Sequence, residues 1–547
     1  MFNSLKRVTE TLRQLSSQLL ALPAMAAQSP ARPKLTGRAF YESIGCPKMI
    51  VAPMVDRSEF AWRLLTRSYL DEERSKSLLA YTPMLHARLF QENPKHRDAY
   101  FRPTRNSLVS KDKSSLPPWL DGNPEIDRPL FVQFCANKTE ELLEAAQYVA
   151  PYCDAVDLNL GCPQGIARSG HYGAFLQEDW DTIYSMINKL HNELSVPVTA
   201  KMRILETREK TLEYAKMILS AGASIITVHG RRREQKGHNT GLADWSMIRY
   251  LRENLPADTV IFANGNILNS DDVEACLTAT GVDGIMSAEG NLSDPTIFAL
   301  PPKERNPREY WYGPDGKGGY RVDAVFRRYM DIIYKYSFDR APPARQPLYI
   351  PGDLKIDSTT ESTDPASQNG VTNSKKRKRE SKPRTDPNLK GMQGHLFQLL
   401  RSLVSVHTDV RDALAKSQYG DMDAYEHVLS MVEKVVMEGL DAEAQRTTED
   451  STVQEEATLG DDLTPKQRTE AKYKRPWWVC QPYIRPLPEE ALKLGAMKLS
   501  KKEMAKLAMQ ESAETKKDPI QRVDDSQQQL QSNSTSDDVP KAALVCG

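Results

Sequence analysis

Val156-Asp157-Leu158-Asn159-Leu160-Gly161-Cys162-Pro163 is the stretch from which the fold of this 547-residue chain can be worked out. Apolar and polar residues alternate up to Gly161, which predicts a short strand. Gly161 and Pro163 end that strand, because glycine tolerates unusual backbone angles and proline cannot continue a ladder. We therefore expect the thiol of Cys162 at the C-terminal end of a strand, on a glycine-rich loop. A purely structural loop cysteine is the alternative at this point.

Strand and helix patterns alternate on both sides of this stretch. Eight apolar runs predict strands: Met49–Val55, Leu78–Leu85, Leu130–Cys135, Ala155–Leu160, Val196–Ile204, Ser224–His229, Val260–Ala263 and Gly284–Ser287. Helical patterns lie between them, among them Phe60–Leu70, Glu140–Val149, Ile183–Leu194, Leu212–Ala221 and Trp245–Leu255. Eight such units in about 250 residues are typical of an α/β protein with a (β/α)8 TIM barrel. A doubly wound open sheet is the alternative, but no Gly-x-Gly-x-x-Gly pattern opens the first unit.

Composition argues against several classes of protein. The 73 basic and 73 acidic residues give no net charge, so the global balance does not indicate nucleic acid. Seven cysteines lie singly, which argues against a disulfide framework and a structural zinc site and suits a reducing compartment. No apolar run reaches the length of a membrane span. We expect neither a metal site nor a membrane segment.

The pattern changes beyond the predicted barrel. Amphipathic helical patterns at Arg321–Tyr336 and Gly394–Gln418 predict a small all-α domain, and segments of low hydrophobicity predict disorder. The adjacent Trp477 and Trp478 predict a segment that docks on the folded body, because two indoles are unfavourable in water. The expected organisation is a disordered tail at 1–36, the barrel at 37–312, a helical domain at 313–445 with a disordered basic insert at 351–388, and a mostly disordered tail at 446–547 with the docking segment at 472–487.

Polar or small residues recur where the predicted strands end. In a TIM barrel these ends share one mouth, where active sites lie. Each residue alone has a structural explanation; Gln133 could cap a ladder, and His229 could be a hydrogen-bonded core histidine. Their joint placement at one end of one barrel favours a site. In chain order they are Pro53, Met54, Val55, Gln133, Asn159, Cys162, Lys201, Arg203, His229, Arg231, Asn264, Gly265, Asn266, Ala288 and Glu289.

These residue types favour a bound flavin. Turns after the last two strands of such barrels commonly bind phosphate through backbone N–H groups and a short helix start, and Asn264-Gly265-Asn266 and Ala288-Glu289-Gly290 have the small residues this needs. The amide of Gln133 can pair with the amide-like edge of an isoalloxazine ring. A lysine such as Lys201, near the pyrimidine end of that ring, would stabilise the charge of a reduced flavin.

The same motifs, in the same order, resemble the tRNA-dihydrouridine synthases. The most specific part is Asp157–Pro163 together with Gly173-Ala174, and the resemblance is strong from Cys46 to Leu300. The helical segment around His395–Asp412 is similar, more loosely, to the RNA-binding domain of that family. Other matching motifs are Ala52-Pro53-Met54, Gln133, Lys201-Met202-Arg203, Val228-His229-Gly230-Arg231 and Asn264-Gly265-Asn266.

Three further segments look most like the eukaryotic branch that acts on positions 16 and 17 of the D-loop. They are Gln235-Lys236-Gly237, Ala288-Glu289-Gly290 and Cys480–Pro486. One departure concerns Glu289, which stands where many bacterial members have Arg. A phosphate at that place must therefore rely on backbone N–H groups or on a cation from elsewhere.

The resemblance implies an oxidoreductase that uses FMN, with NADPH or NADH as reductant. Hydride from reduced FMN would reach C6 of a uracil flipped out of the tRNA, and Cys162 would protonate C5, giving 5,6-dihydrouridine. A proton donor must be a neutral thiol, and cysteines are mostly protonated at neutral pH. Asn159 and Arg203 would face the uracil or its neighbours. The residues that the resemblance assigns to FMN are Pro53, Met54, Val55, Gln133, Lys201, His229, Asn264, Gly265, Asn266, Ala288 and Glu289.

A tRNA substrate requires positive charge for its phosphates. The best candidates are Arg231, Arg232 and Arg233, which follow a strand end beside the predicted site. The run Lys375–Arg379 reads either as a nuclear import signal or as a loose phosphate-binding arm, so nuclear or cytoplasmic location is expected. We expect a monomer, and whether messenger RNA is also a substrate stays open. Further candidate cations are Lys236, Arg401, Arg411, Lys472, Lys474 and Arg475.

Two alternatives remain at this stage. One is a flavin dehydrogenase that acts on a free pyrimidine, which the helical domain and basic loops disfavour. The other is a non-catalytic, tRNA-binding paralogue, which the presence of Cys162, Lys201 and His229 disfavours. Turnover of a free pyrimidine would support the first, and binding of tRNA without flavin would support the second.

Overall fold

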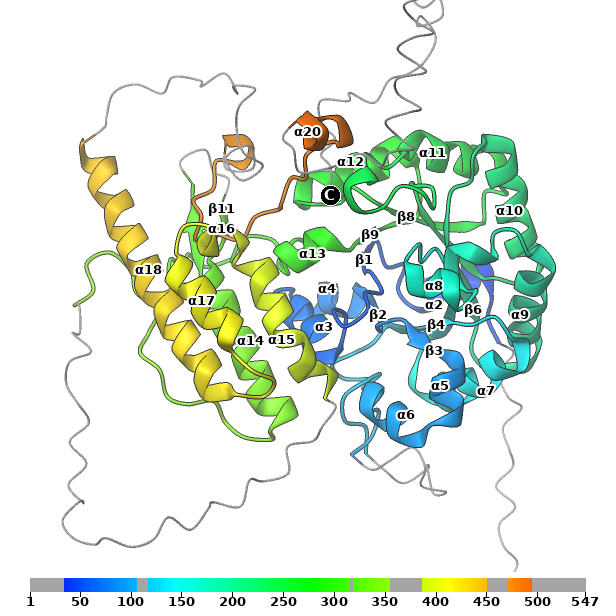
Figure 1. The fold of residues 1–547 in the computed structure, drawn as a ribbon, viewed down its shortest axis with the longest axis horizontal. Helices are drawn as coiled ribbons and strands as arrows, with labels where there is room; N and C mark the ends of the chain where they lie inside the picture. Colours follow the sequence, from blue (N-terminus) through cyan, green and yellow to red (C-terminus); the bar gives the residue numbers. More distant parts are fainter. Residues whose placement is uncertain (1–33, 106–116, 314–317, 355–385, 450–470, 494–547) are drawn as a thin grey trace, which may run out of the picture. The chain divides into compact units, whose positions relative to one another are not determined.

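A computed structural model describes residues 34–105, 117–313, 318–354, 386–449 and 471–493. Its main sheet has nine strands, all parallel, and it closes into a barrel because β2 pairs with β1 on one side and with β4 on the other. The predicted (β/α)8 barrel is therefore confirmed (Figure 1). The strands are β1 (Met49–Val51), β2 (Leu79–Tyr81), β3 (Leu85–His86), β4 (Leu130–Cys135), β5 (Ala155–Leu160), β6 (Val198–Arg203), β7 (Ile225–His229), β8 (Val260–Asn264) and β9 (Gly284–Ser287).

Prolines explain why two strands are shorter than predicted. The second predicted strand, Leu78–Leu85, is divided into β2 and β3 around Pro83, and both pieces pair with β4. The first ends at Val51 instead of Val55, two residues before Pro53. Proline has no backbone N–H and cannot take part in a parallel ladder.

Helices follow the strands and cover the outside of the barrel (Figure 1). Several begin at a residue whose side chain accepts a hydrogen bond from the first turn, as Asp179, Thr207 and Asp244 do. Apolar side chains of strands and helices form the main core cluster. The helices are α3 (Phe60–Arg67), α4 (Glu72–Ser77), α5 (Ala87–Glu92), α6 (Pro94–Tyr100), α7 (Thr139–Val149), α8 (Gly165–Ser169), α9 (Trp180–Glu193), α10 (Arg208–Ser220), α11 (Trp245–Asn254), α12 (Ser270–Thr280) and α13 (Glu289–Ser293).

The barrel interior is packed at its N-terminal end. Phe40 and Tyr41, on α2 (Gly37–Ser43), belong to one apolar cluster with strand residues such as Phe131 and Phe262. The Tyr41 hydroxyl donates to the carbonyl oxygen of Asp283 at 3.0 Å. Space for a ligand in the barrel is therefore confined to the opposite end, where the strands end.

Strand register brings predicted site residues into two neighbouring rows. Asn159 on β5 lies opposite Lys201 on β6, and Arg203 lies opposite His229 on β7. His229 in turn lies opposite Asn264 on β8. Since all strands are parallel, these five residues share the C-terminal end of the barrel.

A group of helices packs beside α3. It comprises α14 (Val322–Ser337), α15 (Pro387–Leu399), α16 (Arg401–Val404), α17 (Thr408–Lys416) and α18 (Met422–Glu449), together with a hairpin of β10 (Tyr310–Tyr312) and β11 (Gly318–Tyr320) (Figure 1). The group shares a core cluster with Trp62 of α3, whose ring stacks on His395 with centroids 3.9 Å apart. The pattern Gly394–Gln418 predicts one helical stretch, but the structure divides it among α15, α16 and α17.

Residues 471–487 form what we call the C-terminal strap, which crosses from the helical group to the barrel and leads into α20 (Pro488–Lys493), orange in Figure 1. Trp478 and Cys480 are buried in the same core cluster as the helices. The N–H of Cys480 donates to the carbonyl of Tyr320 at 2.8 Å, and that of Val322 donates to the carbonyl of Trp478 at 2.9 Å. The strap is thus packed against the folded body.

Some predictions lie outside the described residues. These concern the tail before residue 34, the basic run Lys375–Arg379 with most of its insert, and the tail after residue 493. Among the helices that the structure describes, none has the length and apolar character needed to span a bilayer.

Candidate active site

Cys162 lies two residues past the end of β5 and is partly buried. The side-chain oxygen of Asn159 accepts hydrogen bonds from the N–H groups of Gly161 at 3.1 Å and Cys162 at 2.9 Å. Gly173 approaches from the other side with φ +65°, and a Cβ there would come within 2.9 Å of both the Cβ and the carbonyl oxygen of Cys162. The side-chain amide of Asn159 and the close approach of Gly173 therefore set the position of Cys162.

Asp157 holds this arrangement from inside the barrel. Its carboxylate, fully buried, accepts from Thr199 Oγ1 at 2.7 Å and from Gln133 Nε2 at 2.8 Å. The oxygen of Gln133 then accepts from Asn159 Nδ2 at 2.8 Å. Burial raises the pKa of Asp157 to about 6, and the two bonds to the carboxylate oppose that rise. The result is a hydrogen-bonded chain from a carboxylate, through two amides, to the backbone of Cys162.

Arg203 joins the cysteine loop to the loop after β7. Its Nε donates to the carbonyl of Gly161 at 2.8 Å, and its Nη1 donates to that of Arg232 at 2.9 Å. Lys236 adds a second link, from Nζ to the carbonyl of Pro163 at 2.6 Å. Burial lowers the pKa of Arg203 to about 10, which leaves it cationic at neutral pH. The contact of Arg203 and of Asn159 with uracil stays a prediction, since both side chains are bonded to protein here.

Lys201 lies between the cysteine and the turn after β8. The residue is 9% exposed, and its amine donates a hydrogen bond to Asn264 Oδ1 at 2.9 Å. Burial, and then the charge of Arg203, lower the pKa of Lys201 to about 7, while Asp157 opposes the change. Lys201 can therefore gain or lose a proton near neutrality, and a negative ligand charge beside it would favour the protonated form.

His229 is held in its neutral form. Burial and the charges of Arg203, Lys201 and Arg231 lower its pKa well below the ordinary value. Nη1 of Arg231 lies 3.2 Å from His229 Nε2. Because a guanidinium can only donate, we assign Nε2 as the acceptor and place the ring proton on Nδ1.

The turn after β8 has an unusual backbone conformation. Gly265 has φ +109° and Asn266 has φ +62°, and a Cβ at Gly265 would come within 2.7 Å of the Ala243 side chain. The indole of Trp245 donates to the carbonyl of Gly265 at 3.0 Å. Asn266 Oδ1 accepts from Arg231 Nη2 at 2.8 Å, whereas its Nδ2 is buried with no partner among the described residues. A buried donor without a partner favours a ligand here.

A cavity of about 260 Å³ opens at this end of the mouth. It brings together predicted residues of four strand ends with residues of the loop after β7 and of the strap. Its lining comprises Pro163, Gln164, Arg203, His229, Arg231, Gln235, Lys236, Gly237, Thr240, Asn264, Gly265, Asn266, Ile267, Leu268, Met286, Ala288, Glu289 and Arg485.

The remaining predicted residues lie around this cavity or away from it. Pro53, Met54 and Val55 form the loop after β1, where Val55 is 56% exposed. Among the three consecutive arginines, Arg231 is buried and bonded inside the mouth, while Arg232 is exposed. Arg233, the third arginine, pairs with Glu178 at 2.6 Å and stacks on Phe175. Contact of the three with RNA stays a prediction.

Sequence reasoning missed three residues of the mouth. The sequence predicts Asp157 only as part of a motif, and Thr199 is not among the predicted site residues. Both have an available signal: they lie on the same inward face as Asn159 and Lys201, two residues away along each strand. Arg485 lies in the Cys480–Pro486 motif and in the predicted docking segment 472–487, but neither indicates that its side chain lines the mouth.

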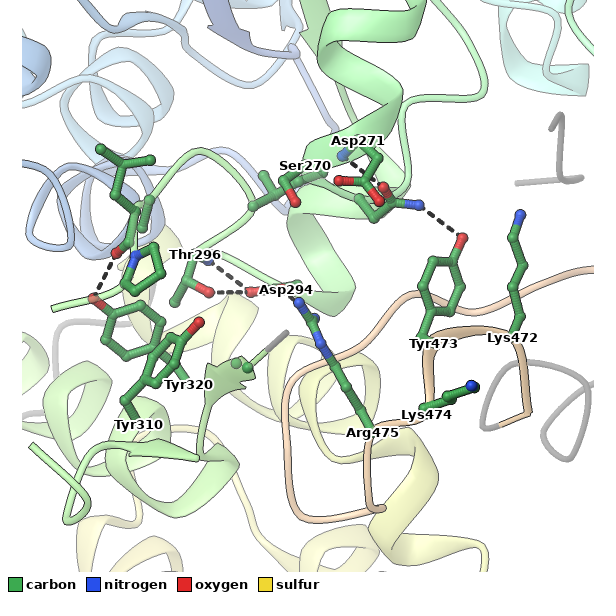
Figure 2. Close-up of a pocket in the computed structure, with 17 residues that line it drawn as sticks. Ser270, Asp271, Asp294, Thr296, Tyr310, Tyr320, Lys472, Tyr473, Lys474 and Arg475 are labelled. Carbon is green, nitrogen blue, oxygen red and sulfur yellow. Dashed lines mark hydrogen bonds and ion pairs between the residues drawn. The ribbon is translucent and has the colours of Figure 1, made fainter. Parts of the chain in front are cut away.

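A larger cavity, of about 420 Å³, lies where the strap meets α12 and the β10–β11 hairpin. Figure 2 shows its lining residues, among them Tyr310, Tyr320 and Lys472. It includes none of the predicted mouth residues, so the candidate site is the smaller cavity.

Comparisons with known proteins show the family of the chain. A family model described as Dihydrouridine synthase (Dus) matches residues 50–341. A Schizosaccharomyces pombe protein named tRNA-dihydrouridine(16/17) synthase, with NAD(P)(+) in its name, is 44% identical over 460 residues, which are 84% of this chain and 92% of that protein. A Saccharomyces cerevisiae protein of the same name is 41% identical, over 85% of this chain and 90% of that protein.

A human protein named as a tRNA-dihydrouridine(20a/20b) synthase-like protein is also similar, to a smaller extent. It is 32% identical over 253 residues, which are 46% of this chain and 70% of that protein. Similarity to the proteins named for positions 16 and 17 thus covers nearly twice as much of the chain.

Proposed function

The chain belongs to the dihydrouridine synthase family, and we propose that it reduces uridines 16 and 17 of tRNA to 5,6-dihydrouridine, with FMN as cofactor and NADPH or NADH as reductant. One observation carries the proposal: the similarity to two yeast proteins named for these positions spans 84% and 85% of the chain. The extent of that match supports positions 16 and 17 over 20a and 20b.

The mouth of the barrel fits a flavin phosphate and ring. Gly265 lets the turn pack closely on Ala243 and His229, and among the described residues the buried Nδ2 of Asn266 is a donor without an acceptor. Lys201 and Gln133 supply a cation and an amide of fixed orientation for the ring. We propose that these residues hold FMN together with His229, Asn264, Ala288 and Glu289, and with Pro53, Met54 and Val55. When bound and reduced, the flavin supplies the hydride for C6 of the uracil.

The protein supplies the proton for C5. Cys162 Sγ carries it, and the hydrogen bonds that Gly161 and Cys162 donate from their backbone N–H groups to Asn159 Oδ1 fix where the thiol can reach. Proton donation by a positioned side chain contributes roughly 10²- to 10⁴-fold to a rate. Lys201, with a pKa of about 7, can take up a proton when negative charge develops beside it.

Recognition of the RNA is assigned to cations around the mouth. Arg232 and Lys236 are exposed on the loop after β7, next to the cysteine loop. We propose that they contact tRNA phosphates, with Arg233 and Lys472 as further candidates. We also propose a monomer with nuclear and cytoplasmic pools, the nuclear pool depending on Lys375–Arg379.

The test uses the purified full chain with NADPH and an unmodified tRNA transcript. Dihydrouridine at positions 16 and 17, mapped by mass spectrometry of RNA fragments, is the expected result. A flavin-bound protein that modifies neither position would overturn the proposal. Reduction of free uracil would favour the pyrimidine dehydrogenase instead, and tRNA binding without flavin would favour the non-catalytic paralogue.

A further inference from the structure

The C-terminal strap is fixed to the barrel before it reaches the mouth. Figure 2 shows Tyr473 and Arg475 pointing toward the barrel from the strap. Asn269, at the start of α12, donates from Nδ2 to the Tyr473 hydroxyl at 2.7 Å. Arg475 Nη1 lies 3.7 Å from Asp294 Oδ2 and donates to the carbonyl of Cys480 at 2.9 Å. Tyr473 and Arg475 therefore attach the strap to the barrel, and the hydrogen bond from Arg475 to Cys480 stabilises the turn of the strap between them.

Two contacts then position the residues next to Arg485. Ile484 is 7% exposed and packs on Leu268, in the loop between β8 and α12. The ring of Tyr483 lies under the guanidinium of Arg401, whose carbon is 4.0 Å from the ring centroid. With its preceding neighbours held by the barrel and by α16, Arg485 is placed against the mouth.

Arg485 there meets Glu289, the first residue of α13. Its Nε and Nη2 donate to the same oxygen, Glu289 Oε1, at 3.1 and 2.6 Å. The side chains are 38% and 18% exposed, so neither charge is sealed from a ligand. Both residues line the cavity at the turn after β8.

The charges at this end of the cavity indicate what the Arg485–Glu289 pair can bind. Glu289 alone would repel a phosphate at the turn that carries the unpartnered Asn266 Nδ2. Arg231, the buried cation nearby, already donates to Asn266 Oδ1 and to the carbonyl of Gly241. Arg485 neutralises Glu289 and presents a guanidinium, whose planar fork suits phosphate oxygens.

We infer that Arg485 of the C-terminal strap is the cation that binds the 5′-phosphate of FMN, and that Glu289 holds its guanidinium at the cavity. This inference rests on the proposed function, since it presumes FMN in the mouth. The cofactor site is then completed by a residue 196 positions away from its partner on the barrel.

The experiment compares FMN with riboflavin, which has the same ring without the phosphate. The full chain, stripped of flavin, is titrated with each by fluorescence quenching. Arg485→Met is expected to weaken FMN binding by about tenfold to a hundredfold, as for a lost charge-assisted bond. Riboflavin affinity should change by less than about twofold, because riboflavin has no phosphate.

Two further variants sharpen the reading. Arg485→Lys keeps the charge without the planar fork and should retain part of the preference for FMN. Arg105→Met is the matched control, because Arg105 forms an ion pair with Asp339 at 2.8 Å and belongs to neither cavity lining described above. It should leave both affinities unchanged, and circular dichroism checks that each variant is folded.

The outcomes separate the inference from the proposed function. Equal weakening of FMN and riboflavin in Arg485→Met would reduce Arg485 to packing of the strap and overturn the inference. Unchanged FMN affinity would overturn it too, as would a wild-type chain without preference for FMN. A lysine variant as weak as the methionine variant would contradict the role of charge. A wild-type chain that binds neither flavin fails the proposed function instead.

Discussion

The two halves of the barrel mouth are built differently. On the half formed by β4, β5 and β6, the polar side chains bond to one another, as Asp157, Gln133 and Asn159 do beneath Cys162. On the half formed by β8 and β9, the nitrogen of the buried Asn266 amide has no partner among the described residues, and Arg485 reaches the mouth from the strap. The first half is organised to fix one thiol in place. The second keeps capacity for a ligand.

This difference predicts that damage to the first half impairs chemistry and leaves flavin binding intact. The largest effect is expected for Cys162→Ala. Loss of the proton donor should slow dihydrouridine formation by roughly 10²- to 10⁴-fold in single-turnover assays with bound, reduced flavin. Flavin content, read from absorbance, should match the wild type.

Cys135→Ala is the control for that variant, because Cys135 is a buried neighbour in the same apolar cluster. It should keep most of the activity. Wild-type activity in Cys162→Ala would show that Cys162 is not the proton donor. The half formed by β4, β5 and β6 would then have no assigned role in the reaction.

Gly173→Ala is expected to have the next largest effect. The added methyl would come within 2.9 Å of Cys162 and would be forced into φ +65°, so the cysteine loop must move. Misplacement of a catalytic group by about 1 Å can cost about a hundredfold in rate, and we expect a loss of between tenfold and that value. Rates are measured with saturating flavin.

Gly165→Ala provides the matched comparison for Gly173→Ala. Gly165 begins α8 in the same loop region, and an added Cβ there meets no atom within 4 Å. Its activity should equal that of the wild type. Equal losses of activity in the two variants would mean that any substitution in the loop is harmful. The close contact between residue 173 and Cys162 would then not explain the effect.

Asn266→Asp tests the second half. An aspartate keeps the acceptor for Arg231 but replaces the unpartnered Nδ2 donor with negative charge. FMN should bind about tenfold more weakly, while the single-turnover rate at saturating FMN stays within about twofold. The reverse pattern, unchanged affinity with a slow chemical step, would assign Asn266 to the first half.

Lys201 lies between the halves and gives the smallest predicted effect, through pH. Its pKa is about 7 in the folded chain against 10.5 for the ordinary group, so between these values the unfolded chain binds one more proton. Stability of the flavin-free chain should therefore rise with pH in this window. From pH 7 to pH 8 the wild type should gain about 1 kcal/mol relative to Lys201→Met in urea unfolding. Parallel pH curves would mean that Lys201 titrates elsewhere.

Much of the first half could be predicted because its information is local. β4 and β5 have the predicted bounds. Asn137 lies just after the end of β4, and Gly161 follows the last residue of β5 directly. Strand ends then identify the mouth residues without any knowledge of side-chain contacts. Periodicity could not reveal that Asn159 accepts hydrogen bonds from the cysteine loop or that Arg203 donates to it, because a pattern of residue types does not specify hydrogen-bond partners.

Long-range contacts explain the failures. The chain leaves the helix at Leu400 and again at residues 405–407, although the apolar residues Leu399, Leu400, Leu403 and Val404 continue a helical pattern. These four residues are all buried in the core cluster that α15, α16 and α17 share with α14 and α18. In the same way, nothing near Arg485 in sequence indicates that Glu289 lies beside it. Both cases depend on tertiary contacts that a window of residues does not contain.

The position of the strap has a consequence for biosynthesis. The barrel emerges from the ribosome before residue 485 is translated, and domains generally fold as they emerge. With Arg485 in the role we infer, a nascent barrel offers FMN an incomplete site until the strap packs between the helical group and α12. Cofactor loading then becomes a late step, and a premature stop codon after the helical group would remove Arg485 together with Trp478 and Cys480 of the helical core.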